Sequence, residues 1–303
     1  LHDALPISFT VAAPLILTAL SVTLAFRAGL FNIGAQGQFI FGAIGASYVG
    51  FHFSLPPVIH ILAAISFALI LSGVWGGLVG LLKARTGAHE VIVTIMLNFI
   101  VLALLNYLVS AKLHVPETLH TPEIHAGALP RLSNIISAFH GSAANWTLVI
   151  VALAAAAAWW FLFKTRAGYE LRAVGLQPDA AEYAGVRVGM TWRNALIVSG
   201  ALAGLGGINF VLGYKGYYED GFTGGAGFLG IAVALVGRNH PLGVVLAALF
   251  FATLSQGGLA INAMVPKQIV EALQGIVIIA VATSVPEVRR ILRNAVAKSG
   301  GSR

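Results

Sequence analysis

The stretch RAGLFNIGAQGQF, residues 27–39, separates two apolar runs and contains three glycines and three uncharged amides. Glycine loosens a helix, and polar groups at membrane depth are tolerated where they line a cavity. This stretch, called the hinge below, therefore predicts a broken helix with amides at Asn32, Gln36 and Gln38. Two roles stay open for these amides. They contact an uncharged polar solute, or they satisfy the backbone groups that are freed at the break.

The composition indicates a membrane protein. The chain is 58% hydrophobic and 10% charged, whereas soluble domains carry roughly 25% charged residues. A helix needs about 20 apolar residues to cross a bilayer, so the apolar windows predict an all-α polytopic membrane protein. Nine spans are expected, at 7–26, 38–54, 57–82, 91–110, 146–163, 195–213, 225–237, 241–257 and 268–285. The second, seventh and eighth are candidates for broken or re-entrant helices.

The basic residues predict the orientation. They are scattered between apolar runs, which argues against nucleic acid as a partner despite the net charge of +7. If the loop LLKARTG is cytoplasmic, alternation leaves only four of the eighteen Lys and Arg residues outside: Lys112, Arg131, Lys215 and Lys267. The skew predicts a cytoplasmic C-terminus, and the chain is expected in the plasma membrane. The first span then runs inward, so a further helix, the tenth, is expected before it in the intact protein.

Three regions are expected along the chain. Residues 1–8, LHDALPIS, have no signal-peptide pattern and are expected to be a non-native start. Residues 9–290 form the transmembrane domain, and residues 291–303 a basic cytoplasmic tail. The chain has no cysteine, which excludes disulfides and thiol catalysis.

Two pairs of similar motifs predict an inverted repeat. FNIGAQG at 31–37 is echoed by FTGGAG at 222–227, and each follows a long span and precedes a short glycine-rich one. EVIVTIMLNFIV from Glu90 likewise pairs with QIVEALQGIVII from Gln268. The spans before the first pair run in opposite directions, as in transporters built from inverted halves.

Further polar residues are candidates for the solute path. Thr94 and Asn98 lie one helical turn apart and are expected to face the same cavity. Glu90 precedes them, and an ion pair with Arg85 competes with a transport role for it. The loop HVPETLHTPEIH holds His114, His120, His125, Glu117 and Glu123. Its spacings match no compact zinc pattern, so a solvated loop without metal is expected. No catalytic motif lies in a span.

The longest hydrophilic segment on the expected inner side is residues 164–194. Within it, LQPDAAEYAGV places Pro178 and Asp179 at the start of a short helix and Gly185 at its end. The segment either lies at the lipid headgroups or offers a small-faced projection that another protein holds.

The motifs AFRAGLFNIGAQGQF, GAHEVIVTIMLNF, RAVGLQPDAAEYAGV and GFLGIAVALVGRNHPLGVVLAALFF, in this order, resemble the membrane permease subunit of bacterial ABC importers. The resemblance is to the branched-chain amino acid and ribose permease superfamily, and within it most to nucleoside-uptake permeases. It covers residues 9–290. Such permeases have one more N-terminal helix, in agreement with the orientation argument.

The resemblance implies a transport subunit that is not itself an enzyme. It implies three protein partners: a second homologous permease, a cytoplasmic ATPase that binds ATP and Mg, and an extracytoplasmic solute-binding lipoprotein. Membrane lipid would surround the chain itself. No phosphate-loop motif occurs in this sequence, so no cofactor is expected in it. The resemblance places the helix that docks into the ATPase at Gln177 to Gly185, with Asp179, Ala180, Ala181 and Gly185 matching its pattern.

Two other functions remain as alternatives. The same machinery could carry sugars or branched-chain amino acids. An ion-coupled secondary transporter or channel would need acidic residues within its spans, and Glu271 is the only acidic residue well inside one.

Overall fold

The computed structural model describes residues 4–124, 127–134, 143–261, 266 and 268–281. Lys267, His125 and the predicted tail 291–303 lie outside these residues. The described part is helical, with two isolated β-bridges, His120–Glu219 and Arg131–Asn145, and no strand. Its main helices are α1 Ala4–Arg27, α2 Ala35–His52, α3 Pro57–Thr86, α4 Glu90–Leu108, α5 Thr147–Lys164, α6 Arg166–Leu176, α7 Pro178–Tyr183, α8 Val188–Ile208, α9 Ala226–Val236 and α10 Pro241–Ala260. Short π-helical turns extend α4 to Leu113 and α8 to Lys215, a 3₁₀ turn covers Leu132–Asn134, and a further helix covers Gln268–Val281.

Six helices of the described chain are long and apolar enough to cross a membrane, so the predicted count of nine is not confirmed. The six are Ile7–Arg27, Pro57–Thr86, Glu90–Leu113, Thr147–Lys164, Val188–Lys215 and Pro241–Ala260. α9 has 11 residues, about 17 Å at the rise of a helix, against a hydrocarbon core of about 30 Å. α2 has 18 residues, but the amides and glycines at its start lower its hydropathy.

The eighth predicted span is not broken. The sequence predicts a broken or re-entrant helix at 241–257, whereas α10 runs continuously through 20 residues. Its early glycine serves a close approach instead. A Cβ on Gly243 would lie 2.3 Å from the carbonyl oxygen of Gly237, so glycine lets α10 turn back tightly against α9.

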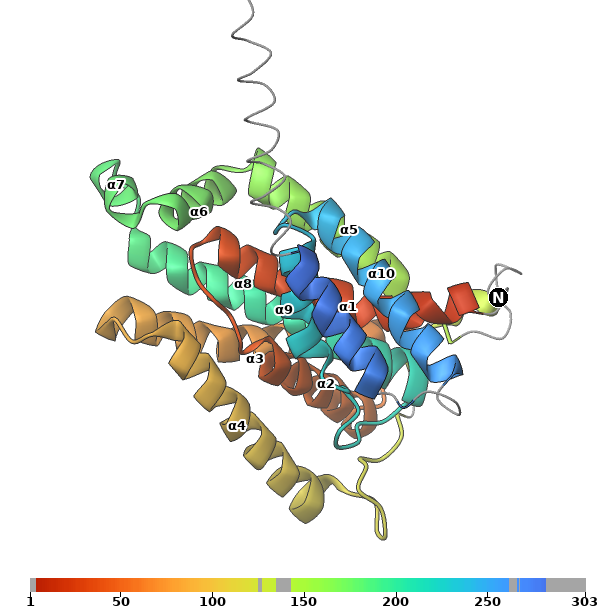
Figure 1. Cartoon of the computed structure of the whole chain (residues 1–303). Helices are drawn as coiled ribbons and strands as arrows, with labels where there is room; N and C mark the ends of the chain where they lie inside the picture. The colour runs from red at the N-terminus through yellow and green to blue at the C-terminus, as the bar shows by residue number, and fades with distance from the viewer. Residues whose placement is uncertain (1–3, 125–126, 135–142, 262–265, 267, 282–303) are drawn as a thin grey trace, which may run out of the picture.

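The core of the bundle is formed by α1 and α8, with α2 beside them (Figure 1). In the spans Ile7–Arg27 and Val188–Lys215, 78% and 72% of the most apolar window is buried, whereas the other four spans reach 28 to 33%. α1 packs against α9 and α10, and α8 packs against α2 and α3. The outer helices expose large apolar side chains such as Ile92, Phe99 and Leu153, which suits a lipid or protein environment rather than water.

The hinge returns the chain from the end of α1 into the bundle (Figure 1). α1 ends in a Schellman motif, in which Leu30 N–H bonds the carbonyl of Ala25 and Gly29 N–H bonds that of Phe26. Gly29 has φ +74°, a conformation that glycine adopts at no steric cost. Residues 28–34 then run inward, and α2 begins inside the bundle at Ala35.

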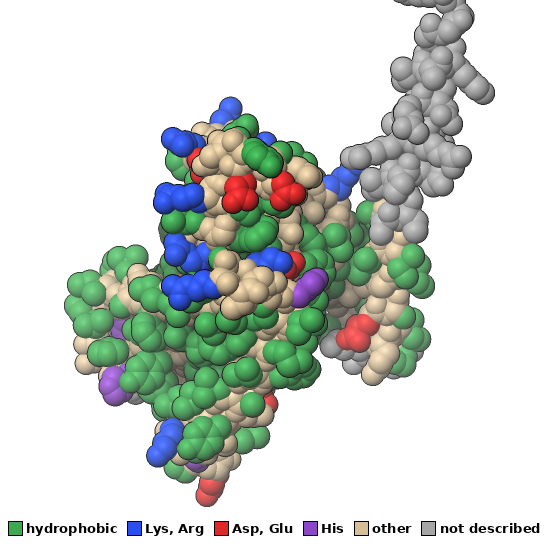
Figure 2. Space-filling view, turned by 90° about the vertical axis from the view of Figure 1, so that its left-hand side faces the viewer, with side chains coloured by type: hydrophobic (Ala, Val, Ile, Leu, Met, Phe, Trp, Pro, Cys, Tyr) green, Lys and Arg blue, Asp and Glu red, His purple; other side chains and the backbone are tan. Residues whose placement is uncertain are grey.

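The basic residues gather at the end of the molecule that carries α6 and α7, called the basic end below. Figure 2 views the molecule from this side and shows several Lys and Arg side chains together. Lys83 lies over the ring of Trp192, and Arg27 donates a hydrogen bond to the carbonyl of Asn239. At the opposite end, the loop before α5 pairs with the segment after α8 through Thr121 N–H and the Tyr218 carbonyl. Burial raises the pKa of the Tyr218 hydroxyl there.

Candidate solute pathway and coupling surface

Two hinge amides are bound to each other and to α8. Asn32 Nδ2 donates to Gln38 Oε1 and to Ser199 Oγ, at 2.8 Å each. Ser199 Oγ in turn donates to the carbonyl of Ser21 on α1 at 2.8 Å. Asn32 and Gln38 are 1% and 0% exposed, so this network ties the hinge to both central helices inside the bundle.

Asn98 on α4 holds the start of α2. Its Oδ1 accepts from Gly37 N–H at 2.9 Å, and its Nδ2 donates to the carbonyl of Ile33 at 3.0 Å. The first four N–H groups of a helix lack partners within the helix, so Asn98 caps α2 from a neighbouring helix. A Cβ on Gly37 would lie 2.6 Å from Asn98 Oδ1, which explains the glycine. Thr94 Oγ1 donates instead to the carbonyl of Glu90 in its own helix.

Gln36 connects the two repeated motifs. Its Oε1 accepts from Gly227 N–H at 2.8 Å, and its Nε2 donates to Thr223 Oγ1 at 2.7 Å. The rings of Phe39 and Phe222 stack nearby, with centroids 5.6 Å apart. Gly227 is the second residue of α9, so Gln36 caps α9 as Asn98 caps α2. The N-termini of two short helices therefore meet at one point, and their dipoles direct partial positive charge towards it.

All five residues predicted for the solute path are buried at or near this point, with exposures of 0 to 6%. Asn98 and Gln36 bind backbone groups at the starts of α2 and α9. This is the role in which the amides satisfy backbone groups that are freed at a helix break. Asn32 and Gln38 bind side chains. The cavities described below are lined by other residues.

Glu90 forms its ion pair with Lys83, and the expected pairing with Arg85 is wrong. Lys83 Nζ lies 2.9 Å from Glu90 Oε2. The tight turn after α3, with Gly87 at φ +69°, brings the start of α4 beside the last turn of α3. Arg85 lies two residues beyond Lys83 and so points to the opposite side of that turn, where it is exposed.

The segment predicted to contact an ATPase forms two helices at the basic end. Thr165 caps α6 by accepting from Gly168 N–H at 3.0 Å. Pro178 opens α7, which has six residues, and Gly185 follows with φ +84°. Gln177, Asp179, Ala180 and Gly185 are exposed, but Ala181 is only 4% exposed and faces its own chain. The sequence pattern could not show this difference, because both alanines match the motif.

Two exposed side chains beside these residues were not singled out by the sequence. Leu176 is 84% exposed and Tyr183 is 94% exposed. Leu176 is the last residue of α6, and Tyr183 is the last residue of α7. Both belong to the segment LQPDAAEYAGV, but an apolar residue type does not by itself show that its side chain is exposed.

Glycines fix α6 to the bundle at both ends. A Cβ on Gly168 would lie 1.9 Å from the carbonyl oxygen of Phe161 on α5, and a Cβ on Gly175 would lie 2.1 Å from that of Arg27 at the hinge. The two glycines are seven residues apart and so lie on one face of α6. Gly175 lies three positions before the start of α7, so the chain contacts the hinge backbone directly ahead of the exposed segment.

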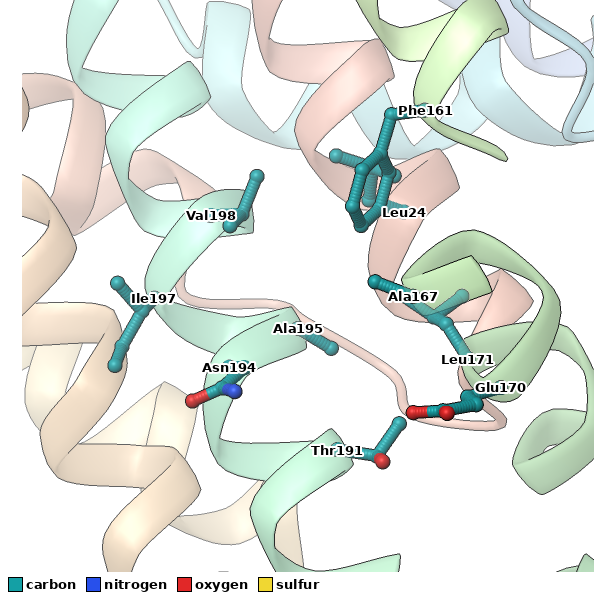
Figure 3. A pocket seen from close by; sticks show the side chains of 10 residues that line it. All are labelled: Leu24, Phe161, Ala167, Glu170, Leu171, Thr191, Asn194, Ala195, Ile197 and Val198. Atoms are coloured by element: carbon teal, nitrogen blue, oxygen red, sulfur yellow. The ribbon is translucent and has the colours of Figure 1, made fainter. Parts of the chain in front are cut away.

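A cavity of about 340 Å³ separates the rest of α6 from α8. Leu24 and Phe161 lie at one end of it, and Glu170, Thr191 and Asn194 at the other (Figure 3). The three polar residues also line a second cavity, together with Arg187 and the residues after α7. α6 therefore contacts α5 and the hinge closely but α8 loosely.

The loop with histidines and glutamates shows no metal-binding cluster in its described part. No three His, Cys, Asp or Glu side chains of the described residues come together. His120 stacks on Tyr217 with ring centroids 4.4 Å apart, and His114 Nδ1 lies 3.2 Å from the carbonyl of Val109.

Comparison with known proteins gives one family. Residues 6–282 match the model of the permease component of the branched-chain amino acid transport system. No solved structure gives a significant match.

Three curated relatives are similar over most of the chain. The guanosine ABC transporter permease protein NupP of Bacillus subtilis is 41% identical over 89% of this chain and 78% of its own length. The glucose ABC transporter permease protein TsgB13 of Haloferax volcanii is 33% identical over 90% and 74%. NupQ, a second guanosine ABC transporter permease protein of Bacillus subtilis, is 29% identical over 81% of this chain and 78% of its own length.

Proposed function

The chain belongs to the permease family of the branched-chain amino acid transport system, and we propose that it is the membrane permease subunit of an ATP-driven nucleoside importer. Its 41% identity to a guanosine permease over 89% of the chain carries this proposal. The six apolar helices make it a multi-pass membrane protein. As in the resemblance described above, ATP and Mg would bind a separate ATPase, and this chain would form the path for the solute.

The chemistry of the hinge supports an uncharged polar solute. The groups at the meeting point of α2 and α9 are amides, hydroxyls and helix N-termini, which offer hydrogen bonds to hydroxyls and heterocycles. A sugar suits the same groups, and one similar permease is named for glucose, so sugars are the nearest alternative. An ion-coupled mechanism is less supported, because Glu271 lies on an exposed face of its helix rather than inside the bundle.

The five path residues act in opening and closing the route. In this structure each is at most 6% exposed, so the route that they would line is closed. Passage requires Gln36 to part from Gly227 and Thr223, which frees the amides and the two helix starts for the solute. The helix contacts support an inverted repeat. The first-half helix α1 packs against α9 and α10 of the second half, and the second-half helix α8 packs against α2 and α3 of the first half.

Coupling to the ATPase runs through α7 and α6. Ala180, Leu176 and Tyr183 would contact the ATPase, and Ala181 would hold α7 on its own chain. Motion of α7 would reach the hinge through the contact of Gly175 with Arg27. The exposed basic end supports a cytoplasmic location for this segment. The pair NupP and NupQ in one organism supports a second permease, with a solute-binding lipoprotein on the other side.

Uptake by the reconstituted complex tests the function. Labelled guanosine should enter vesicles only with ATP, and excess unlabelled glucose or leucine should not compete. Competition by glucose alone would replace the nucleoside by a sugar. Uptake that persists without ATP and follows an ion gradient would overturn the ATP-driven mechanism.

Two hinge variants test the path. Asn32→Leu and Gln36→Leu are expected to impair uptake while the complex still assembles, because each removes a polar group from the route. Normal uptake by both would contradict the pathway role.

A further inference from the structure

Three arginines surround one cavity at the basic end, outside the solute path. The cavity has a volume of about 430 Å³ and is lined by Phe26, Arg27, Arg172, Gly175, Leu176, Arg238 and Asn239. These residues come from the end of α1, from α6, and from the turn between α9 and α10. Its size is within the range of small-molecule sites.

The positive charges of this cavity are not neutralised by the described chain. The three ion pairs among the described residues are Lys83–Glu90, Arg166–Glu170 and Lys215–Glu219, and none includes an arginine of the cavity. Unpaired like charges in one partly buried place repel each other. The arrangement is therefore favourable when an anion lies among them.

Two of the arginines are held in place by an aromatic ring. The guanidinium carbons of Arg27 and Arg172 lie 5.7 and 5.3 Å from the ring centre of Phe163. Arg27 Nε also donates to the carbonyl of Asn239 at 2.8 Å. The third, Arg238, is exposed and has φ +57°, in the tight turn before α10. The guanidinium groups of Arg27 and Arg172 are thus positioned by the fold, and guanidinium forks match phosphate oxygens in geometry.

One residue that lines the cavity carries a hydrogen-bond acceptor without a partner. Asn239 Oδ1 is buried and has no hydrogen-bond partner among the described residues. A buried acceptor without a partner is costly, and a hydroxyl close to the anion would satisfy it. Inorganic phosphate in its protonated form, or a phosphate ester that carries hydroxyls, meets both requirements.

We infer that Arg27, Arg172, Arg238 and Asn239 form a binding site for a phosphate group with a neighbouring hydroxyl. Basic cavities between helices at a membrane surface bind the headgroups of anionic lipids, so phosphatidylglycerol is one source, and a soluble phosphate ester is the other. Because the site joins the end of α1 to α6, its occupant would stabilise the contact between the hinge and the segment formed by α6 and α7.

Lipid retention and thermal stability test the site on the full-length permease purified in its complex. Native mass spectrometry should show phosphatidylglycerol retained over phosphatidylcholine. Separate arms with glycerol 3-phosphate and inorganic phosphate should raise the melting temperature if the source is soluble. A response to lipid alone assigns the site to the headgroup, and a response to the soluble esters alone assigns it to a soluble ligand.

Arg172→Gln and Arg238→Gln should each weaken binding about fivefold, as expected for one arginine near a membrane surface. Arg85→Gln is the matched control, because it removes an exposed charge from the same end outside the cavity. Arg238→Lys keeps the charge but loses the guanidinium fork, so it should weaken binding less than Arg238→Gln does. Since the Arg238 side chain is exposed, Arg238→Gln should melt like the wild type without ligand. Equal loss in Arg85→Gln would overturn the site, and so would a wild type that binds none of phosphatidylglycerol, glycerol 3-phosphate and inorganic phosphate.

Discussion

The hinge and the α6–α7 segment are both polar interruptions between apolar helices, but the hinge is buried in the bundle and much of the α6–α7 segment is exposed. The hinge amides are buried and hydrogen-bonded, with Gln38 at 0% exposure. Tyr183, at the end of α7, is 94% exposed. Polarity in a membrane chain therefore marks two different things. Inside the bundle it accompanies hydrogen bonds that join the hinge to neighbouring helices, and outside it accompanies exposed apolar side chains.

Gly175 joins the two regions, and its substitution should have the largest effect. Gly175→Val places a side chain where a Cβ would already lie 2.1 Å from the carbonyl oxygen of Arg27. Because that neighbour is backbone, α6 must separate from the hinge. Overpacking costs about 1–3 kcal/mol, so uptake should fall roughly tenfold or more.

The control is Gly257→Ala in α10, where no atom lies within 4 Å of the added Cβ. It should keep wild-type uptake and gain up to about 1 kcal/mol of helix stability. Uptake and the melting temperature of the complex are measured for both. Normal uptake by Gly175→Val would break the proposed connection between the regions.

Asn98→Leu should show that the hinge depends on side-chain caps. It leaves Gly37 N–H and the carbonyl of Ile33 without their partner, and each buried group costs about 1–3 kcal/mol. A melting temperature clearly below that of the wild type is expected. Thr94→Val is the control, because the Thr94 hydroxyl bonds its own helix, and it should be nearly neutral. Equal melting of both variants would show that the caps contribute nothing.

Ala180 and Ala181 test the outer region with neighbouring residues. Ala180→Trp adds bulk on the exposed face and should weaken co-purification of the ATPase ten- to hundredfold, for an overpacking cost of about 1–3 kcal/mol. Its melting temperature should not change. Ala181→Trp should instead lower the stability of the permease, because Ala181 is 4% exposed. If Ala180→Trp retained the ATPase fully, α7 would be no docking site.

The sequence predicts the local parts of both regions. Glycines and amides at 27–39 predict the break before α2, and Pro178 and Gly185 delimit α7. The family was also identified from the motifs alone, as the match over residues 6–282 confirms. These signals are local, since each depends on the conformations that a residue type allows.

What the sequence could not predict depends on distant neighbours. Gln36 meets Gly227 across 191 positions, and no short-range pattern gives that pairing. The glycines of α10 suggested a break, but Gly243 serves packing against Gly237. Hydropathy windows also counted α9 as a span, because composition does not show that the chain enters the bundle in an irregular segment before the helix begins.

The smallest perturbation tests how the two regions are placed across the membrane. Single cysteines at Arg172 and His120, in a chain without cysteine, should be labelled from opposite sides by an impermeant reagent. The side chains of Arg172 and His120 are partly buried, which slows labelling. Cysteines at Arg187 and Glu117, which are exposed on the same two segments, should react faster and repeat the measurement. Neither exposed site is expected to change stability by more than about 0.5 kcal/mol. If both cysteines were labelled from one side only, the basic end and the loop that contains His120 would lie on the same side of the membrane. The chain between the two labelled positions would then cross the membrane an even number of times. The ATPase and the solute-binding protein could not contact these two segments from opposite sides, as the proposed function requires.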